Sequence, residues 1–184
     1  MSAAVDTREG KLILDSHKLS YHMDRVQAWE SGERIAPISV DMALTRACGA
    51  MCTFCYAMVQ ESQERSSVKT PVALKLVDDF ERLGIRSVSL VSDGESTLSP
   101  AYVPFIKHAY EAGIDVGNGT NGWEWEPEKI EQVLPYLTWV RFTVAAGRPS
   151  TYANMMYKGP EHTQVFDRAM ANIKYAVDLK RMKN

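Results

Sequence analysis

The sequence predicts an α/β fold in which parallel strands alternate with outer helices. The first observation is a fourfold alternation of strand-like and helix-like segments, at residues 38–84, 87–112, 114–134 and 139–182. The second is that glycine or proline stands at several boundaries between these segments. The third is that polar turn residues follow the strand-like runs. Because α/β folds build their sites just after the carboxyl ends of strands, we look for function in these turns.

Composition and charge narrow the class of protein. The chain has 184 residues, 45% of them hydrophobic and 24% charged, which suits one globular domain. Its net charge of −2 offers no overall basic field, so general nucleic-acid binding is disfavoured. No run approaches the roughly 20 apolar residues of a membrane span, and the start does not resemble a secretory signal. Cysteines kept as thiolates favour a reducing, cytoplasmic location.

Residues 1–37 form a separate amino-terminal segment in this interpretation. Residues 11–15 are predicted as a short strand and 17–30 as a helix. His17 and His22 are interpreted as incidental, because nothing near them completes a metal or catalytic set. The helix is predicted from apolar residues at intervals of three or four, which would share one face: Leu19, Met23, Val26 and Trp29.

The remaining elements follow in order from residue 38. An alternating strand at 38–45 leads into the cysteines, and residues 60–69 are predicted as a loop or frayed helix. Thr70 is predicted as a cap, with Pro71 in the first turn of a helix that stops at Gly84. Further strands are predicted at 87–91, 114–117 and 138–145, and further helices at 100–112, 127–134 and about 163–182. The last helix is predicted to bury Val165, Phe166, Ala169, Ile173, Ala176 and Val177, after a connection over 147–159.

All three cysteines lie within eight residues, in the spacing C-x₃-C-x₂-C from Cys48 to Cys55. Structural zinc sites usually use four ligands in two separated pairs, which this run does not offer. An iron–sulfur cubane with three cysteine ligands leaves one iron open to bind a reacting molecule. Buried free cysteines are the alternative, and a disulfide would leave one sulfur over. The clustering favours a metal site.

The cysteine run resembles the C-x₃-C-x-Φ-C signature of the radical S-adenosylmethionine (radical SAM) enzymes, with Phe54 in the aromatic position. The resemblance implies that Cys48, Cys52 and Cys55 hold a [4Fe–4S] cluster whose fourth iron is chelated by SAM. A flavodoxin- or ferredoxin-like reductant would then drive cleavage of SAM to a 5′-deoxyadenosyl radical, which abstracts hydrogen from a substrate. The resemblance also implies that Phe54 and Tyr56 lie near the adenine. It assigns no protein residue a catalytic role.

The turn at 92–96 stands where the family has its Gly-Gly-Glu-Pro motif. Gly94 and Glu95 match this motif, and the resemblance implies that they meet the amino group of the bound methionine moiety. Asp93 and Ser96 replace the first glycine and the proline. A plain turn is the alternative. The position of this turn, one strand–helix–strand unit after the cysteines, favours the functional interpretation.

Further SAM contacts are implied at the ends of the later strands. Thr120 and Asn121 stand in a Thr-Asn-Gly turn, although Asn-Gly is also a common turn without any ligand. Thr143 stands where the fourth strand of the family often places a hydroxyl near the SAM ribose or carboxylate. Lys158 is a weaker candidate for pairing with the SAM carboxylate, with a solvated lysine as the alternative.

The resemblance implies a partial (β/α) barrel and covers residues 38–184, the amino-terminal two-thirds of the family's core of six units. The chain ends where a fifth strand would begin, so the core is expected to be incomplete after its fourth unit. An exposed fourth strand would invite pairing. A completing chain or a homo-oligomer are therefore the expected partners, besides the reductant.

The substrate is not visible in the sequence. By analogy alone, we favour a ribosomally made peptide. Trp123 and Trp125 would either wall a substrate pocket or anchor the following helix. Two other functions stay open. One is a non-catalytic iron–sulfur or zinc module that serves as a partner subunit, which would bind metal without affinity for SAM. The other is an inactive radical SAM fold, which would bind SAM without cleaving it.

Overall fold

Four parallel strands form one sheet at the centre of the chain. The computed structural model describes residues 19–58, 66–157 and 159–183. The sheet has the order β1-β2-β3-β4, so each strand lies beside the next one along the chain, as the strands of a barrel wall do. Its strands are β1 (Ser39–Asp41), β2 (Ser87–Leu90), β3 (Asp115–Thr120) and β4 (Trp139–Phe142). The predicted α/β class and parallel sheet are confirmed.

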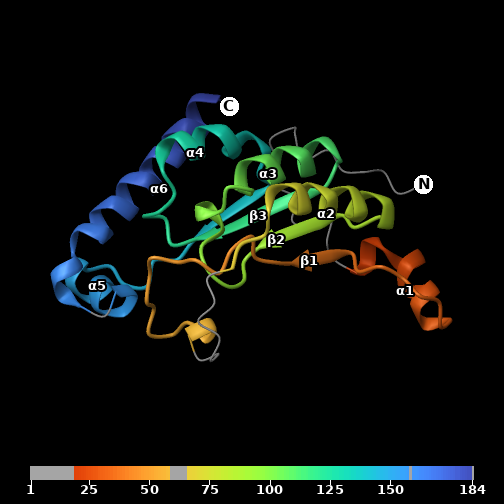
Figure 1. Ribbon diagram of the computed structural model, residues 1–184, viewed down its shortest axis with the longest axis horizontal. Helices are drawn as coiled ribbons and strands as arrows, with labels where there is room; N and C mark the ends of the chain where they lie inside the picture. Colours follow the sequence, from red (N-terminus) through yellow and green to blue (C-terminus); the bar gives the residue numbers. More distant parts are fainter. Residues whose placement is uncertain (1–18, 59–65, 158, 184) are drawn as a thin grey trace.

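Helices α2, α3 and α4 lie along one face of this sheet (Figure 1). Helix α6 packs against α4 and α5, and α1 lies beyond the β1 edge. Within the described parts of the chain, no helix is both long and apolar enough to cross a membrane. The helices are α1 (Met23–Glu30), α2 (Thr70–Leu83), α3 (Tyr102–Glu111), α4 (Pro127–Val133), α5 (Pro149–Tyr157) and α6 (Gln164–Lys183). Short 3₁₀ turns are η2 (Leu19–Tyr21), η3 (Tyr56–Met58), η4 (Ser96–Leu98), η5 (Leu134–Tyr136) and η6 (Pro160–His162).

The main core lies between the sheet and its helix layer. Strand side chains alternate between the two faces, so Val88 and Val116 are register partners that point the same way, and both are buried. Phe105 of α3 is buried in the same cluster. Trp125 is fully buried there as well, which confirms it as an anchor for α4. Burying each such side chain contributes about 1.5–3 kcal/mol.

Helix α2 shows how local signals set element boundaries. Its bounds match the prediction, Pro71 lies in the first turn, and Gly84 ends the helix with a left-handed φ of 72°. The predicted cap is wrong by one residue. Thr70 is already helical and Lys69 occupies the capping position, with extended backbone and no side-chain hydrogen bond.

The amino-terminal helix differs from its prediction. The turn η2 precedes α1, and none of the residues of α1 is buried. The predicted apolar face is largely exposed, since Leu19 and Trp29 are each 65% exposed. The side chain of Arg25 attaches the helix to the rest of the chain through the carbonyl of Gly84 at 2.9 Å. The predicted strand at 11–15 and His17 lie outside the described residues.

The strand ends also differ from prediction. The first strand stops at Asp41, and beyond it the Leu44 carbonyl accepts the N–H of Val68 at 2.9 Å. The third strand continues to Thr120, which pairs with Phe142 of β4. The turn that was expected from residue 118 therefore begins only after Thr120.

The last third of the chain contains one more helix than expected. Residues 149–157 form α5 where only a connection was predicted. In α6, Val177 is 42% exposed, contrary to prediction, while Asn172 and Leu179 are buried. The observed stripe recurs at alternating intervals of four and three, which keeps one face toward the fold: Val165, Ala169, Asn172, Ala176 and Leu179.

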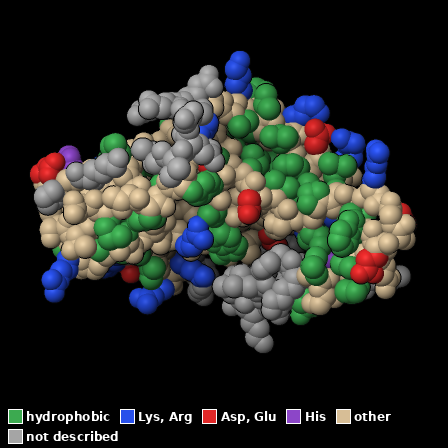
Figure 2. Space-filling view, turned by 90° about the horizontal axis from the view of Figure 1, so that it is seen from below, with side chains coloured by type: hydrophobic (Ala, Val, Ile, Leu, Met, Phe, Trp, Pro, Cys, Tyr) green, Lys and Arg blue, Asp and Glu red, His purple; other side chains and the backbone are tan. Residues whose placement is uncertain are grey.

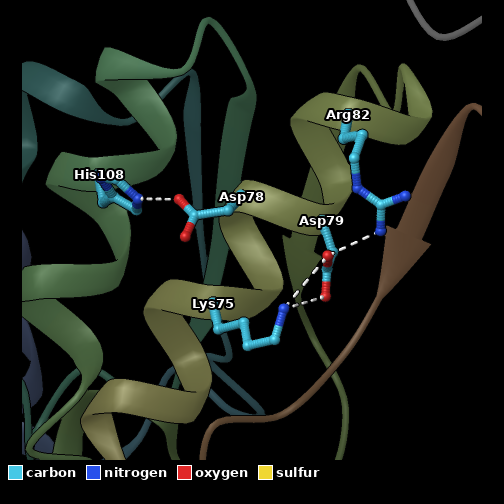
Figure 3. A network of polar contacts seen from close by, with 5 residues as sticks. All are labelled: Lys75, Asp78, Asp79, Arg82 and His108. Carbon is cyan, nitrogen blue, oxygen red and sulfur yellow. Dashed lines mark hydrogen bonds and ion pairs between the residues drawn. The ribbon is translucent and has the colours of Figure 1, made fainter.

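Charged side chains join α2 and α3 on the outer surface of the helix layer (Figure 3). His108 Nε2 lies 2.6 Å from Asp78 Oδ1, which links the two helices. Within α2, Asp79 contacts Lys75 at 3.3 Å and Arg82 at 2.9 Å, and these cations lower its pKa. Water surrounds the pairs, so they add little to stability.

The loop after β2 is fastened to the segment that leads into the cysteines. Gly94 has φ 70°, and a Cβ there would lie 2.2 Å from the Thr45 carbonyl oxygen. The Glu95 N–H donates to the Ala47 carbonyl at 2.8 Å. Arg46 and Asp93 form an ion pair at 3.5 Å. The sequence motif therefore needs its glycine here for both conformation and space.

We expect Gly94→Ala to destabilise the fold more than a matched change at Gly113. Gly113 is also left-handed, with φ 71°, but a Cβ there meets nothing within 4 Å. Gly113→Ala should therefore lower the free energy of unfolding by only about 1–2 kcal/mol. Gly94→Ala should lower it by about 1–3 kcal/mol more, because the added methyl meets backbone that has no room to move. Urea unfolding followed by circular dichroism measures both, and equal losses would contradict this packing.

Candidate functional site

The loops that follow the four strands meet at the carboxyl edge of the sheet. The cysteine loop follows β1, residues 91–95 follow β2, residues 121–126 follow β3, and residue 143 begins the segment after β4. Hydrogen bonds join the first three of these loops to one another, and the Thr143 N–H donates to the carbonyl of Thr120 at the end of β3. The predicted site residues that the structure describes therefore belong to one region.

The three cysteines are free and partly buried. The N–H of Cys55 donates to the Cys52 carbonyl at 3.1 Å, which turns the loop tightly. In the described portion of the chain, no three His, Cys, Asp or Glu side chains are close enough to hold one metal ion. A cubane binds each thiolate to a different iron, so its cysteines need not converge on one point. Three reduced thiols in one loop fit the donor chemistry of such a cluster.

Burial keeps two of these thiols protonated. With burial as the largest cause, the pKa of Cys48 is raised to about 12 and that of Cys52 to about 11. Nearby negative groups contribute to these shifts, Glu124 and Glu95 at Cys48, and Cys55 and Glu95 at Cys52. The thiolate is the form that binds metal, so loading of this loop must release protons. The positive charge of a bound metal would stabilise the thiolate forms of these cysteines, which burial in the loop disfavours.

Glu95 joins the loop after β2 to the loop after β3. Its side chain is buried, with an exposed fraction of 3%. One carboxylate oxygen accepts the Asn121 N–H at 2.7 Å, and the other accepts the Thr97 hydroxyl at 2.8 Å. Burial raises the pKa of Glu95, although these donors lower it in part. In this structure the carboxylate thus holds two site loops together from within.

Asn121 extends this connection to the cysteine loop through Glu124. The Asn121 side chain accepts the N–H groups of Trp123 and Glu124 and donates to a Glu124 carboxylate oxygen at 2.7 Å. The same carboxylate accepts the Gly49 N–H at 3.1 Å, one residue after Cys48. The sequence analysis did not single out Glu124. An Asn followed three residues later by Glu is a capping-type pattern that would have indicated it.

The structure describes four of the other predicted SAM contacts, which are Thr120, Thr143, Phe54 and Tyr56. The Thr120 hydroxyl accepts the Gly122 N–H at 3.0 Å, and the Thr120 carbonyl accepts the Thr143 N–H at 2.9 Å. Phe54 and Tyr56 are 53% and 59% exposed at the outer side of the cysteine loop. Lys158 lies outside the described residues.

Helix α5 supports the cysteine loop, and no sequence signal indicated this. The N–H of Met51 donates to the Met156 carbonyl at 2.7 Å, and the N–H of Thr53 donates to the Met155 carbonyl at 2.9 Å. The Tyr152 hydroxyl donates to the Asn121 carbonyl at 3.4 Å. These contacts join residues far apart in the chain, so local patterns cannot reveal them.

We expect Glu95→Gln to change how stability depends on pH. A raised pKa in the folded state means that the contribution of Glu95 is present at low pH and is lost as pH rises through that pKa. Relative to Glu95→Gln, the wild-type protein should therefore lose unfolding free energy as pH rises from the ordinary pKa of a glutamate through the raised pKa of the folded state. Urea titrations across this range measure the difference. Glu128→Gln at an exposed site is the control, and a difference that stays constant with pH would count against buried ionisation at Glu95.

Comparisons with known proteins are consistent with this fold. A family model described as the Radical SAM superfamily matches residues 42–181. Among the curated proteins compared, none matches the chain. Streptococcus suis SuiB bound to precursor peptide SuiA aligns at 13% identity and a TM-score of 0.60, covering 84% of this chain and 35% of SuiB.

Two other solved structures align at similar quality. The protein anSMEcpe with bound AdoMet has 17% identity and a TM-score of 0.59, covering 78% of this chain and 42% of its own. TYW1 with a lysine-pyruvate adduct has 18% identity and a TM-score of 0.52, covering 75% and 48%. The chain thus spans about a third to a half of the length of the proteins it matches. Since the family model covers most of the chain and the fold agrees, the chain belongs to the radical SAM superfamily.

Proposed function

We propose that this chain forms the cluster- and SAM-binding part of a radical SAM enzyme, with Cys48, Cys52 and Cys55 as the cluster ligands. The observation that carries the proposal is the set of three free thiols in one loop after β1, hydrogen-bonded to the loops after β2 and β3 through Glu95 and Glu124. A [4Fe–4S] cluster bound there would supply the electron that cleaves SAM to a 5′-deoxyadenosyl radical. A flavodoxin- or ferredoxin-like protein would reduce it.

In this proposal the residues of the chain bind and orient the two cofactors. The backbone at Gly94 would face the methionine moiety of SAM, and the Glu95 carboxylate would hold that backbone through Asn121. Thr120 and Thr143 would offer polar groups near the ribose or carboxylate. Their neighbouring backbone positions, joined at 2.9 Å, support a shared role.

The outer side of the cysteine loop would bind the adenine. Phe54 and Tyr56 are exposed there, so they are accessible to a ligand. Lys158 is retained as a weaker candidate partner for the SAM carboxylate. These assignments place the adenine at the loop after β1 and the methionine moiety at the neighbouring loop after β2.

The proposed substrate is a peptide. The structure of SuiB bound to a precursor peptide supports this class, because SuiB shares the fold. The face of the molecule that is seen from below carries hydrophobic side chains interspersed with charged ones (Figure 2). Such a mixed surface suits a peptide that presents both kinds of side chain. Residues 38–184 would supply the cluster half of the site, and a further part of the barrel or a second chain would complete the wall.

We expect the reconstituted protein to form 5′-deoxyadenosine from SAM and dithionite under anaerobic conditions. Cys52→Ala should abolish this product, because the cubane would lose one of its three protein ligands. Chromatography of the small-molecule products measures the yield. His108→Ala is the matched control, since His108 pairs with Asp78 on the outer surface of the helix layer and should leave the yield unchanged.

Two outcomes would contradict the proposal in different ways. A cluster that forms and binds SAM without cleaving it would indicate a fold that is inactive as this chain. Binding of zinc in place of iron, without affinity for SAM, would favour a non-catalytic metal-binding partner subunit. Measuring iron, zinc and sulfide together with the 5′-deoxyadenosine product distinguishes these two outcomes.

A further inference from the structure

Met156 lies directly against the middle cysteine of the loop. The side chain of Met156 is fully buried at the end of α5. Its sulfur lies 3.5 Å from Sγ of Cys52. The two residues that flank Cys52 are both bound to α5 through their backbone N–H groups, Met51 at 2.7 Å and Thr53 at 2.9 Å. These two hydrogen bonds bracket the cysteine and hold its sulfur against the thioether.

Hydrophobic packing fixes the position of the Met156 side chain. Met156 belongs to a small hydrophobic cluster with Tyr152, Val165 and Ala169, which joins α5 to α6. Cys52 packs against this cluster. A methionine on the surface would sample many rotamers, whereas this one is enclosed, so its sulfur has a defined place beside the thiol.

A thioether beside a metal-bound cysteine differs from most polar neighbours in one respect. It has no proton to donate, and it is only a weak acceptor. Hydrogen bonds to the sulfurs and exposure to solvent are among the factors that set the reduction potential of an iron–sulfur cluster. Donors and water stabilise the more negative, reduced cluster and so raise the potential. A buried methionine at this place excludes both from one side of Cys52.

We propose that Met156 is a positioning residue that holds Cys52 in place and keeps hydrogen-bond donors and water from its sulfur, which lowers the reduction potential of the cluster. This role rests on the proposed function, because it requires that Cys52 binds the cluster. The family motif does not include Met156, which follows Cys52 by 104 residues. The contact between the two sulfurs and the two flanking backbone hydrogen bonds carry the assignment.

The test compares three variants of the reconstituted full chain. Met156→Gln keeps the length of the side chain and adds an N–H donor, so its cluster should have a more positive midpoint potential than the wild type. Met156→Leu adds no donor and should stay close to the wild type. Met155→Gln is the matched control, because Met155 also accepts a loop N–H through its carbonyl, while its side chain does not belong to the hydrophobic cluster of Met156 against which Cys52 packs. Redox titration followed by electron paramagnetic resonance gives the potentials, and circular dichroism checks folding.

Equal potentials for Met156→Gln and Met155→Gln would overturn the assignment. A second measurement on cluster-free protein separates this outcome from failure of the proposed function. Met156→Ala should raise the rate of iodoacetamide alkylation at Cys52 several-fold relative to Cys55 in the same sample, as read by peptide mass spectrometry, while Met155→Ala should not. An unchanged ratio would show that Met156 does not cover Cys52. If the wild type assembles no cluster, the proposed function fails, and the ratio still decides whether this cover exists.

Discussion

The arrangement of the site depends on one buried hydrogen bond, from the Asn121 N–H to the Glu95 carboxylate at 2.7 Å. A carboxylate taken out of water is costly, and the hydrogen bonds from Asn121 and Thr97 offset this cost only while both donors stay in place. This requirement couples the loop after β2 to the loop after β3. The Glu124 carboxylate accepts the N–H of Gly49, which stands beside the first cysteine, and so connects these loops to the cysteine loop. The loops therefore hold one another in register before any ligand is bound.

The cysteine loop is held through its backbone, which leaves its thiols available. Gly49 bonds to Glu124 on one side, and Met51 and Thr53 bond to α5 on the other. None of these contacts uses a thiol as the anchor, although Cys52 touches Met156. Burial keeps the thiols of Cys48 and Cys52 protonated as long as no metal is bound. Binding of a metal by these two thiols would therefore release their protons.

Elements bounded by strong local signals were predictable from the sequence. Pro71 and Gly84 delimit α2 because one pre-forms the helical φ and the other accepts a left-handed φ. The exposed face of α1 was mispredicted because an amphipathic pattern gives a preferred face without saying whether a partner covers it. In the site, the positions of the loops could be predicted because each loop follows a strand. The contact between Met156 and Cys52 could not be predicted, since it depends on how α5 folds back, which no local pattern encodes.

Among the described elements, those that hold the cysteine loop differ from the strand at the β4 edge. Among the described residues, the N–H groups of Gly49, Met51 and Thr53 donate to the loop after β3 and to α5, and the N–H of Glu95 in the loop after β2 donates to Ala47, all within the stretch that the family model matches. These elements, together with residues 66–68, which bond to Leu44 and Arg46, hold the cysteine loop. The β4 edge contributes differently, because Arg141 is exposed there and Val144, just beyond it, is 44% exposed. A surface that lies against this edge can vary in shape and charge while the hydrogen bonds around the cysteines stay the same. Under the proposed function, a change in the surface at the β4 edge would therefore leave the arrangement of the cysteines as it is.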